Sequence, residues 1–295
     1  MTVRGYVMVD GVAAGMDEPV IAATDMGFLH GDTLFTTLAV HAGRPVLWKA
    51  HYARLSESAR KSGFPPLPPP ESLRDELLEA IRIQPEPPFG LRVTLSRGRA
   101  IPPGIDGVSE APVRVVLPLF RPPRAEGLLR EGSLAETFLL PWDPAADPRF
   151  SHKTGNLLWV KGIRRMRRHP ESADQLLLGR RGEILEGTVS SVFAVDADGV
   201  LGTAPLSAGI LPGIMRGEVL AWARRQGLPT REAAPLFPEA ASFREIFLTS
   251  ATLPVLPLHT VFDPSGMIRL SRDFPVALAF LDHYRSRMEA GEEEP

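Results

Sequence analysis

The chain contains no cysteine among its 295 residues. Disulfides, thiolate metal sites, a CxxC redox pair and a cysteine nucleophile are therefore excluded. A chain of this length buries most of the surface that its unfolded form would expose, so it needs no such cross-link to fold. The absence of cysteine fits a reducing compartment, and we expect a cytoplasmic protein.

The sequence also lacks an excess of charge of one sign, and we expect neither a signal peptide nor a membrane span. With 33 lysine and arginine residues against 35 aspartate and glutamate residues, the net charge is -2. With this balance the chain has no overall positive electrostatic potential that would attract nucleic acid or an anionic membrane. No apolar run approaches the roughly 18 residues of a membrane helix. We therefore expect a small-molecule substrate, no nucleic-acid partner and no membrane association.

Common phosphate and nucleophile motifs are missing as well. The sequence has no Walker loop, no GxGxxG after a predicted strand and no GxSxG turn. Its seven histidines show no HExxH or similar ligand spacing, so we predict no metal site. The dense basic run RRMRRH, residues 164–169, has no interleaved aromatics and is interpreted as a solvated helix end.

Lysine is the scarcest basic residue, with four lysines against 29 arginines. Two of the four lie in the stretch from Arg149 to Gly162, and Lys153 stands between His152 and Thr154. An arginine stays protonated in proteins, whereas a lysine amine can lose its proton and attack a carbonyl. Lys153 is therefore either a surface lysine or a nucleophile that arginine could not replace.

Strand-like and helix-like patterns are interspersed without regular βαβ periodicity, which favours two α+β domains over one doubly wound sheet. Strands and hairpins are predicted over residues 4–48, and further strands over 90–98, 113–120, 174–179, 182–195 and 245–250. Helices are predicted over residues 49–63, 71–82, 154–169, 213–227 and 274–289.

A short, charged and proline-rich segment, RPPRAEG at residues 121–127, is the predicted interdomain linker. It would separate an N-terminal α+β domain, residues 1–120, from a C-terminal cofactor-binding domain, residues 128–290. The last residues, 291–295, are predicted to form an acidic, disordered tail.

Three further features carry candidate chemistry, and each also has an ordinary explanation. Arg54, on the predicted helix 49–63, is either a surface arginine or a phosphate ligand. Glu186 precedes a glycine in a strand-like run and is either solvated or paired with a buried cation. The segment ILPGIMRG, residues 210–217, is either a plain junction of loop and helix or a helix start that binds an anion.

In this order, the four features resemble those of pyridoxal phosphate enzymes of fold type IV. The chain resembles the class IV aminotransferase family, which includes branched-chain aminotransferases, D-amino acid aminotransferases and 4-amino-4-deoxychorismate lyases. The similarity extends over nearly the whole chain, through DMGFLHGDTLFTT, HYARL, LRVTLSRG, HKTGN, GEILEGTVSSVF, LPGIMRG and FLTSATLPVLPL. It implies a two-domain α+β fold like that of D-amino acid aminotransferase, with the active site in the interdomain cleft. It also implies a homodimer whose active site borrows loop residues from the partner.

The resemblance gives roles to individual residues. Lys153, in a KxxN pattern with Asn156, would form the Schiff base with pyridoxal phosphate and then act as general base. Glu186 would bond the pyridine nitrogen and keep its proton. Leu211 would pack against the ring. The phosphate would be held by Arg54, by the backbone amides of Ile214 and Met215, and by the loop residues Ser250 and Ala251.

The reaction class is inferred from the sequence around Thr36. Phe35, Thr36 and Thr37, together with Ala251, are most similar to aminodeoxychorismate lyases, because class IV aminotransferases more often have a glutamate at Thr36. The predicted reaction releases pyruvate and 4-aminobenzoate, a precursor in folate synthesis. Ordinary β-propensity could also explain the FTT run. The alternatives are an aminotransferase for branched-chain, D- or aromatic amino acids and a cofactor-free binding protein.

Recognition of the substrate carboxylate is the least determined part of the site. The run RAIPPGIDG, residues 99–107, replaces the loop rich in glycine and arginine that lyases have, and Ser191 replaces a common asparagine. Phe35 and Thr37 are candidate substrate contacts, with Arg92 and Arg97 as candidate carboxylate ligands and Arg99 as a third. Because their spacing is odd, Arg92 and Arg97 should point to opposite faces of a regular strand.

Overall fold

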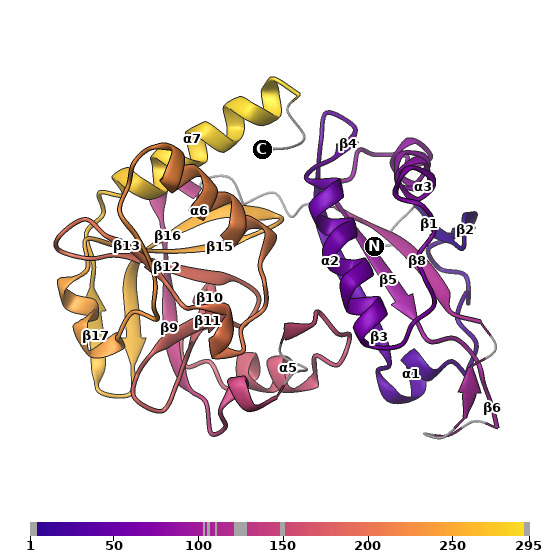
Figure 1. Ribbon diagram of the computed structural model, residues 1–295, viewed down its shortest axis with the longest axis horizontal. Helices are drawn as coiled ribbons and strands as arrows, with labels where there is room; N and C mark the ends of the chain where they lie inside the picture. The colour runs from indigo at the N-terminus through magenta and orange to yellow at the C-terminus, as the bar shows by residue number, and fades with distance from the viewer. Residues whose placement is uncertain are drawn as a thin grey trace. The chain divides into compact units, whose positions relative to one another are not determined.

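The computed structural model describes residues 5–102, 104, 107–109, 111–120, 129–147 and 151–291 (Figure 1). These residues fall into two units. The first takes in the described part of Met1–Pro122 together with His152–Leu157, and the second the described part of Pro123–Ser151 with Leu158–Gly291. Residues 152–157 thus belong to the first unit, although the sequence assigned them to the C-terminal domain. The predicted linker 121–127 and, beyond Gly291, the predicted tail lie outside the described residues.

The first unit is built on a six-stranded antiparallel sheet in the order β2-β1-β8-β5-β3-β4. Its strands are β1 (Tyr6–Val9), β2 (Val12–Gly15), β3 (Thr33–His41), β4 (Arg44–Pro45), β5 (Gly90–Ser96) and β8 (Val113–Leu119). A small separate sheet pairs β6 (Ala100–Ile101) with β7 (Val108–Ser109). The helices are α1 (Met26–His30), α2 (Trp48–Lys61) and α3 (Pro70–Arg82).

Alternation along the strands decides which side chains of the first sheet are covered. Leu34 and Leu38 on β3 and Val93 on β5 pack into one core with Leu55 of α2 and Leu77 of α3. Because side chains alternate between the two faces of a strand, the residues directly next to these positions point to the other face. Phe35 and Thr37 pair with Thr94 and Arg92 on that second face, which carries more polar groups.

The second unit contains a nine-stranded mixed sheet among its described residues, in the order β11-β10-β9-β16-β15-β12-β13-β14, with β17 beside β16. Its strands are β9 (Ser133–Leu139), β10 (Asp174–Leu178), β11 (Ile184–Gly187), β12 (Ser191–Val195), β13 (Leu201–Thr203), β14 (Thr230–Glu232), β15 (Glu245–Ser250), β16 (Leu253–Asp263) and β17 (Gly266–Arg269). Its helices are α5 (Leu158–Arg165), α6 (Ile214–Arg225) and α7 (Pro275–Glu289), with 3-10 turns at Pro144–Ala146, Leu206–Ala208 and Phe237–Ser242.

Three predicted elements differ from the observed ones. Residues 4–48 are predicted to form strands and hairpins, but Met26–His30 form helix α1, which the Asp25 side chain caps by accepting from the Phe28 amide. The predicted helix 154–169 is confirmed only as α5, because residues 152–157 instead make strand-like contacts with β3 in the first unit. The predicted strand 182–195 is divided into β11 and β12 by the turn Thr188–Ser190. The alternation of helices and sheets in both units confirms the predicted two-domain α+β class.

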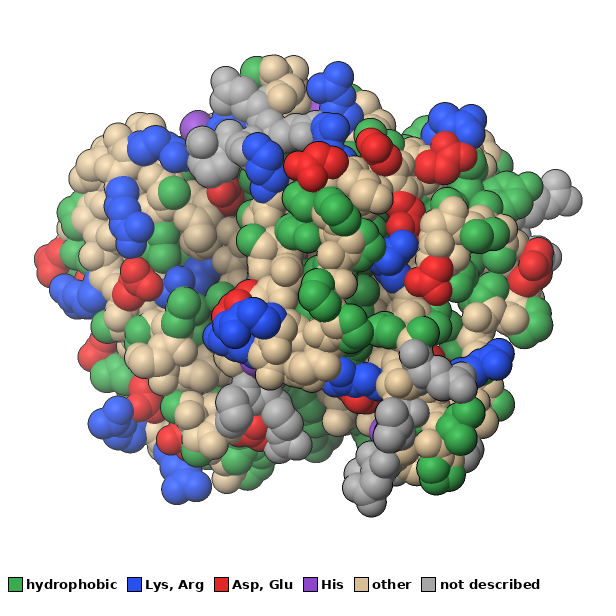
Figure 2. Space-filling view, turned by 45° about the vertical axis from the view of Figure 1, so that its right-hand side comes forward, with side chains coloured by type: hydrophobic (Ala, Val, Ile, Leu, Met, Phe, Trp, Pro, Cys, Tyr) green, Lys and Arg blue, Asp and Glu red, His purple; other side chains and the backbone are tan. Residues whose placement is uncertain are grey.

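The surface carries charges of both signs. Figure 2 shows lysine and arginine side chains interspersed with aspartate and glutamate on the face that it draws. Of the helices within the described ranges, none has both the length and the apolar character that crossing a bilayer demands. In the same residues, no group of three or more histidine, aspartate or glutamate side chains is arranged to hold a metal ion.

Candidate functional site

The segment that carries Lys153 lies against the start of β3, inside the first unit. The amide of Phe35 donates to the carbonyl of Lys153 at 2.9 Å, and the amide of Gly155 donates to the carbonyl of Thr33 at 3.0 Å. A β-bridge between Leu34 and Thr154 lies between these two bonds. The lysine backbone is therefore fixed by long-range hydrogen bonds to a strand more than one hundred residues earlier in the sequence.

Two cationic side chains contact one aromatic ring on the second face of the first sheet. The Lys153 Nζ atom lies 4.9 Å from the centroid of the Phe35 ring, and the Arg92 Cζ atom lies 3.5 Å from it. Arg92 also donates from Nε to the Thr94 hydroxyl at 3.1 Å. Burial lowers the pKa of Arg92 from its ordinary value. The structure thus brings together three predicted site residues, with Lys153 and Arg92 on the buried ring of Phe35.

Arg54 lies on α2 and reaches the buried hydroxyl of Thr36. Its Nη2 atom donates to Thr36 Oγ1 at 3.1 Å, and His51 Nδ1 lies 2.7 Å from the same oxygen. Thr36 and His51 are both almost fully buried. Burial lowers the pKa of Arg54 to about 10, so its guanidinium stays charged at neutral pH. Arg54 is therefore a half-buried cation of the kind that binds phosphate.

His51 is held neutral by its surroundings. Burial and then the positive charges of Arg54 and Lys153 lower its pKa well below the ordinary value. A buried neutral imidazole can share a proton with the Thr36 hydroxyl without adding a third positive charge. Sequence reasoning missed this histidine, although its position three residues before Arg54 in HYAR places both on one face of α2.

Arg97 has a different environment from Arg92. Its guanidinium bonds the Asp32 carboxylate at 2.9 Å and the carbonyls of Ser62 and Gly63 at 2.8 Å, and it stacks on Phe64. All three nitrogens of the Arg97 guanidinium therefore already donate hydrogen bonds, and these bonds connect the end of β5 to the end of α2. Of the other substrate candidates, Thr37 faces Arg92 across the β3–β5 pair, while Arg99 is exposed just after β5.

In the second unit, Glu186 lies near the end of β11 and faces the loop before α6. Its Oε2 atom accepts a hydrogen bond from the backbone amide of Leu211 at 3.2 Å. The carboxylate is thereby tied to the segment LPG that leads into the helix. A carboxylate held in this way is suited to accept a further hydrogen bond from an N–H group of a ligand.

The start of α6 presents backbone amides. Gly213 is the N-cap, and the first helical bond of this turn is donated by Gly217 to the Gly213 carbonyl at 3.1 Å. The amides of Ile214 and Met215 precede it in the first turn, where helix geometry provides no intrahelical acceptor. Such amides, with the helix dipole, favour an anion. Ser250 ends β15, and Ala251 begins the following turn.

Comparison with known proteins adds the family. The family described as amino-transferase class IV matches residues 33–261, which is most of the chain. The chain belongs to this family. It is 28% identical over 257 residues to D-alanine aminotransferase of Bacillus licheniformis, covering 86% of this chain and 88% of that protein.

Two further similar proteins come from Mycobacterium tuberculosis. One is described as a bifunctional aminodeoxychorismate lyase and D-amino acid transaminase, and it is 28% identical over 273 residues, covering 86% of this chain and 90% of that protein. The other is a solved structure, a hypothetical aminotransferase in its PLP-bound form. It superimposes with a TM-score of 0.81 at 28% identity, covering 94% of this chain and 96% of that chain.

The donor set of the described residues fits pyridoxal phosphate, the cofactor of this enzyme family. The cofactor offers an aldehyde, a phosphate and a pyridine nitrogen. The chain offers the Lys153 amine, the charged Arg54 guanidinium with the amides of Ile214 and Met215, and the Glu186 carboxylate. The chain is therefore a pyridoxal phosphate-dependent enzyme of class IV, and the assignment of each residue to a part of the cofactor stays a prediction.

Proposed function

We propose that this class IV enzyme is a 4-amino-4-deoxychorismate lyase that releases pyruvate and 4-aminobenzoate. The observation that carries the proposal is the pair of cationic groups, the Lys153 amine and the Arg92 guanidinium, on the Phe35 ring. A substrate that places its amino-bearing carbon at Lys153 and a carboxylate at Arg92 would satisfy both. When bound, pyridoxal phosphate withdraws electrons from the amino-bearing carbon and so makes its proton acidic.

Lys153 would remove that proton and hold it at Nζ. The bond between the ring carbon and the enolpyruvyl oxygen then breaks, and the ring becomes aromatic as 4-aminobenzoate. Lys153 returns a proton so that the departing enolpyruvate leaves as pyruvate, which balances the reaction without an oxidant. Arginine could not fill this role, because its guanidinium keeps its proton.

Arg92 is the preferred carboxylate ligand, with Phe35 and Thr37 as neighbouring substrate contacts. Arg97 is disfavoured because the Asp32 carboxylate and two backbone carbonyls already occupy its donors. Thr36 supports the lyase reading, since a neutral hydroxyl stands where class IV aminotransferases more often have a glutamate, beside a neutral His51.

An aminotransferase for D-amino acids is the second candidate. It is favoured by the likeness to D-alanine aminotransferase and by the bifunctional name of the Mycobacterium tuberculosis relative. Both reactions begin when the lysine amine removes the proton from the amino-bearing carbon of the substrate. They differ in the next step, because only the lyase substrate carries an enolpyruvyl leaving group. An amino acid that lacks a leaving group would instead give its nitrogen to the cofactor.

The first prediction concerns Lys153. The enzyme loaded with pyridoxal phosphate should convert 4-amino-4-deoxychorismate to 4-aminobenzoate and pyruvate, both measured by liquid chromatography. Lys153→Ala should abolish turnover and the borohydride-stabilised attachment of cofactor seen by mass spectrometry. Lys161→Ala is the matched control, because Lys161 is an exposed lysine of the same stretch. No 4-aminobenzoate, alongside rapid conversion of the cofactor to its amine form by D-alanine, would select the aminotransferase.

The second prediction concerns Arg92. Arg92→Gln should lower kcat/KM for the carboxylate substrate about 10- to 100-fold, mainly through KM, because a charge-assisted hydrogen bond is lost. Cofactor attachment to Lys153 should persist in this variant. An unchanged KM would remove Arg92 from the substrate site and leave the role of Lys153 intact.

A further inference from the structure

A three-residue turn joins β11 to β12, although the two strands are not neighbours in the second sheet. Four other strands lie between these two in the hydrogen-bonded order of the described sheet, yet only Thr188–Ser190 join them in the chain. Such a turn spans at most about 14 Å. The sheet must therefore curl until its β11 edge approaches β12, and the amides of the turn need acceptors other than a strand partner.

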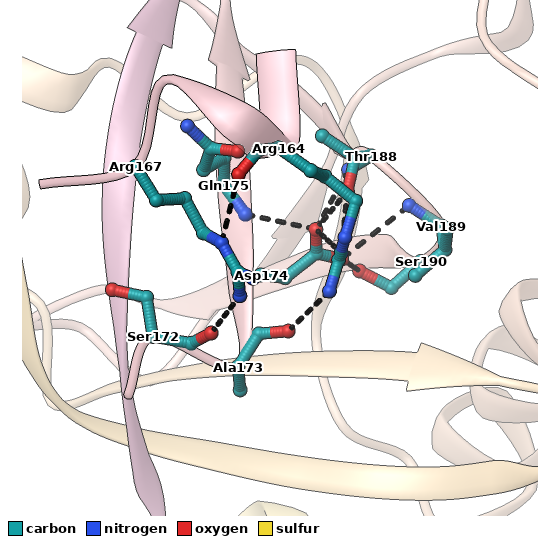
Figure 3. A network of polar contacts seen from close by, with 9 residues as sticks. All are labelled: Arg164, Arg167, Ser172, Ala173, Asp174, Gln175, Thr188, Val189 and Ser190. Carbon is teal, nitrogen blue, oxygen red and sulfur yellow. Dashed lines mark hydrogen bonds and ion pairs between the residues drawn. The ribbon is translucent and has the colours of Figure 1, made fainter. Parts of the chain in front are cut away.

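The buried carboxylate of Asp174, at the start of β10, supplies these acceptors (Figure 3). Oδ1 accepts from the Thr188 amide at 3.0 Å and from the Thr188 hydroxyl, and Oδ2 accepts from the Val189 amide at 3.4 Å and the Ser190 hydroxyl at 2.7 Å. One side chain thus holds every residue of the turn.

Asp174 is itself held in place. Arg164 of α5 donates to Oδ1 at 3.1 Å and also to the Thr188 hydroxyl at 2.8 Å. The amide of Gln175 donates to the same carboxylate at 2.8 Å. Gly187 is required before the turn, because a Cβ there would lie only 2.5 Å from Asp174 Oδ2. A buried charge with this many donors is fully compensated and rigid.

The two ends of the turn lead to Glu186 and to a residue beside Gly213, which precedes the Ile214 and Met215 amides proposed to hold the phosphate. Glu186 lies two residues before Thr188, and its carboxylate meets the Leu211 amide. Ser191 follows Ser190, and a Cβ on Gly213, the N-cap of α6, would lie 2.6 Å from the Ser191 hydroxyl. A shift of the turn would move both groups, since β11 is a short edge strand with an irregular register.

We propose that Asp174 is a positioning residue for Glu186: its carboxylate fixes the turn that follows Glu186 and so sets where the Glu186 carboxylate meets the pyridine nitrogen. The inference rests on the role proposed above for Glu186. Asp174 touches neither cofactor nor substrate in this scheme, and it acts through the Thr188–Ser190 turn alone.

The test is a double-mutant cycle of Asp174→Asn and Glu186→Gln, in which the affinity and the visible spectrum of the cofactor are measured. Asp174→Asn keeps the shape but places an amide NH₂ against N–H and O–H donors. In tryptophan fluorescence titrations, Asp174→Asn should bind pyridoxal phosphate about tenfold more weakly than the wild type. The pH titration of the bound cofactor's visible spectrum should shift toward that of Glu186→Gln. The double variant should be less than additive, because both changes disturb one contact.

Asp196→Asn is the matched control. Asp196 accepts the amides of Asp198 and Val200 in a turn that lies between β12 and β13. Its loss should lower the melting temperature and leave the cofactor spectrum unchanged. Should Asp174→Asn fail to fold, Ser190→Ala removes one donor of the network and should shift the same spectrum in the same direction, to a smaller extent.

The possible outcomes separate this inference from the proposed function. A spectrum like that of the wild type in both Asp174→Asn and Ser190→Ala, or full additivity with Glu186→Gln, would overturn the positioning role. If the wild-type protein and Glu186→Gln bind the cofactor identically, the assigned role of Glu186 fails, and the positioning role fails with it. A lyase assay without product, with the spectral coupling intact, would overturn only the reaction class.

Discussion

The Thr36 hydroxyl shows how one residue can set the charge of a site. It accepts from Arg54 and shares a hydrogen bond with His51, so a cation and an imidazole meet at one neutral oxygen. A carboxylate at this position would pair with Arg54 and favour a protonated His51. Threonine instead adds no negative charge beside Arg54.

The neutral state of His51 predicts a dependence of stability on pH. In the unfolded chain a histidine titrates near 6.5, while burial and neighbouring cations keep the pKa of His51 well below that value in the folded chain. As the pH falls below about 6.5, the unfolded state binds more protons than the folded state. The free energy of unfolding therefore decreases toward acid pH.

His51→Gln should reduce this dependence by up to about 1.4 kcal/mol per pH unit between about pH 7 and 5, because one titrating group is removed. The glutamine amide can still bond the Thr36 hydroxyl. Urea unfolding at a series of pH values measures the effect, and His41→Gln, at an exposed histidine of β3, is the control. Equal slopes in the wild type and His51→Gln would contradict the neutral assignment.

At the scale of elements, the lysine segment is the one whose structure depends most on distant residues. The segment 152–157 makes two backbone hydrogen bonds to β3, through Lys153 and Gly155. His152 Nδ1 also lies 3.1 Å from the Ser58 hydroxyl of α2. The sequence predicts that this helix begins at residue 154. The hydrogen bonds to β3 delay the helix to Leu158.

Gly155 permits this docking, since a Cβ there would clash with the Thr33 hydroxyl. Gly155→Ala should lower the free energy of unfolding by about 1–3 kcal/mol, the usual cost of overpacking, and slow the attachment of cofactor to Lys153. Gly162→Ala, on α5 with open space around it, should instead stabilise by about 0.5–1 kcal/mol. Chemical denaturation and borohydride trapping would measure both, and equal stability of the two variants would argue against the docked segment.

At the scale of the whole molecule, the groups proposed to bind one cofactor are divided between the two units. Lys153 and Arg54 belong to the first unit, whereas Glu186 and the start of α6 belong to the second. The family resemblance predicts that the enzyme is a homodimer. These assignments are tested by the Lys153 and Glu186 variants above and by the oligomeric state.

Light scattering at working concentration should give a mass near twice that of the 32.2 kDa chain. The reason is that a site which borrows loop residues from its partner is complete only in the dimer. A dilution series followed by cofactor fluorescence should show weaker binding where the dimer dissociates. A monomer that retains full cofactor affinity would contradict the prediction.

The sequence by itself determined the elements whose patterns are local. Helices α2, α3, α6 and α7 follow from apolar spacing and from glycine or proline at their ends, and strands β5, β8, β10 and β15 follow from runs of β-rich residues. The order of the motifs also predicted the family and its cofactor, because those motifs are read along the chain without reference to folding.

Only the tertiary structure decided the features that depend on distant partners. Strand β16 contains Pro254 and Pro257, which argue against a strand in isolation, yet it pairs with β15 and β9. Asp32 and the end of α2 engage Arg97, and β3 receives the lysine segment. The pairing of β16 with β9, the contacts of Arg97 and the docking of the lysine segment rest on hydrogen bonds between residues far apart in sequence, which neither periodicity nor propensity encodes.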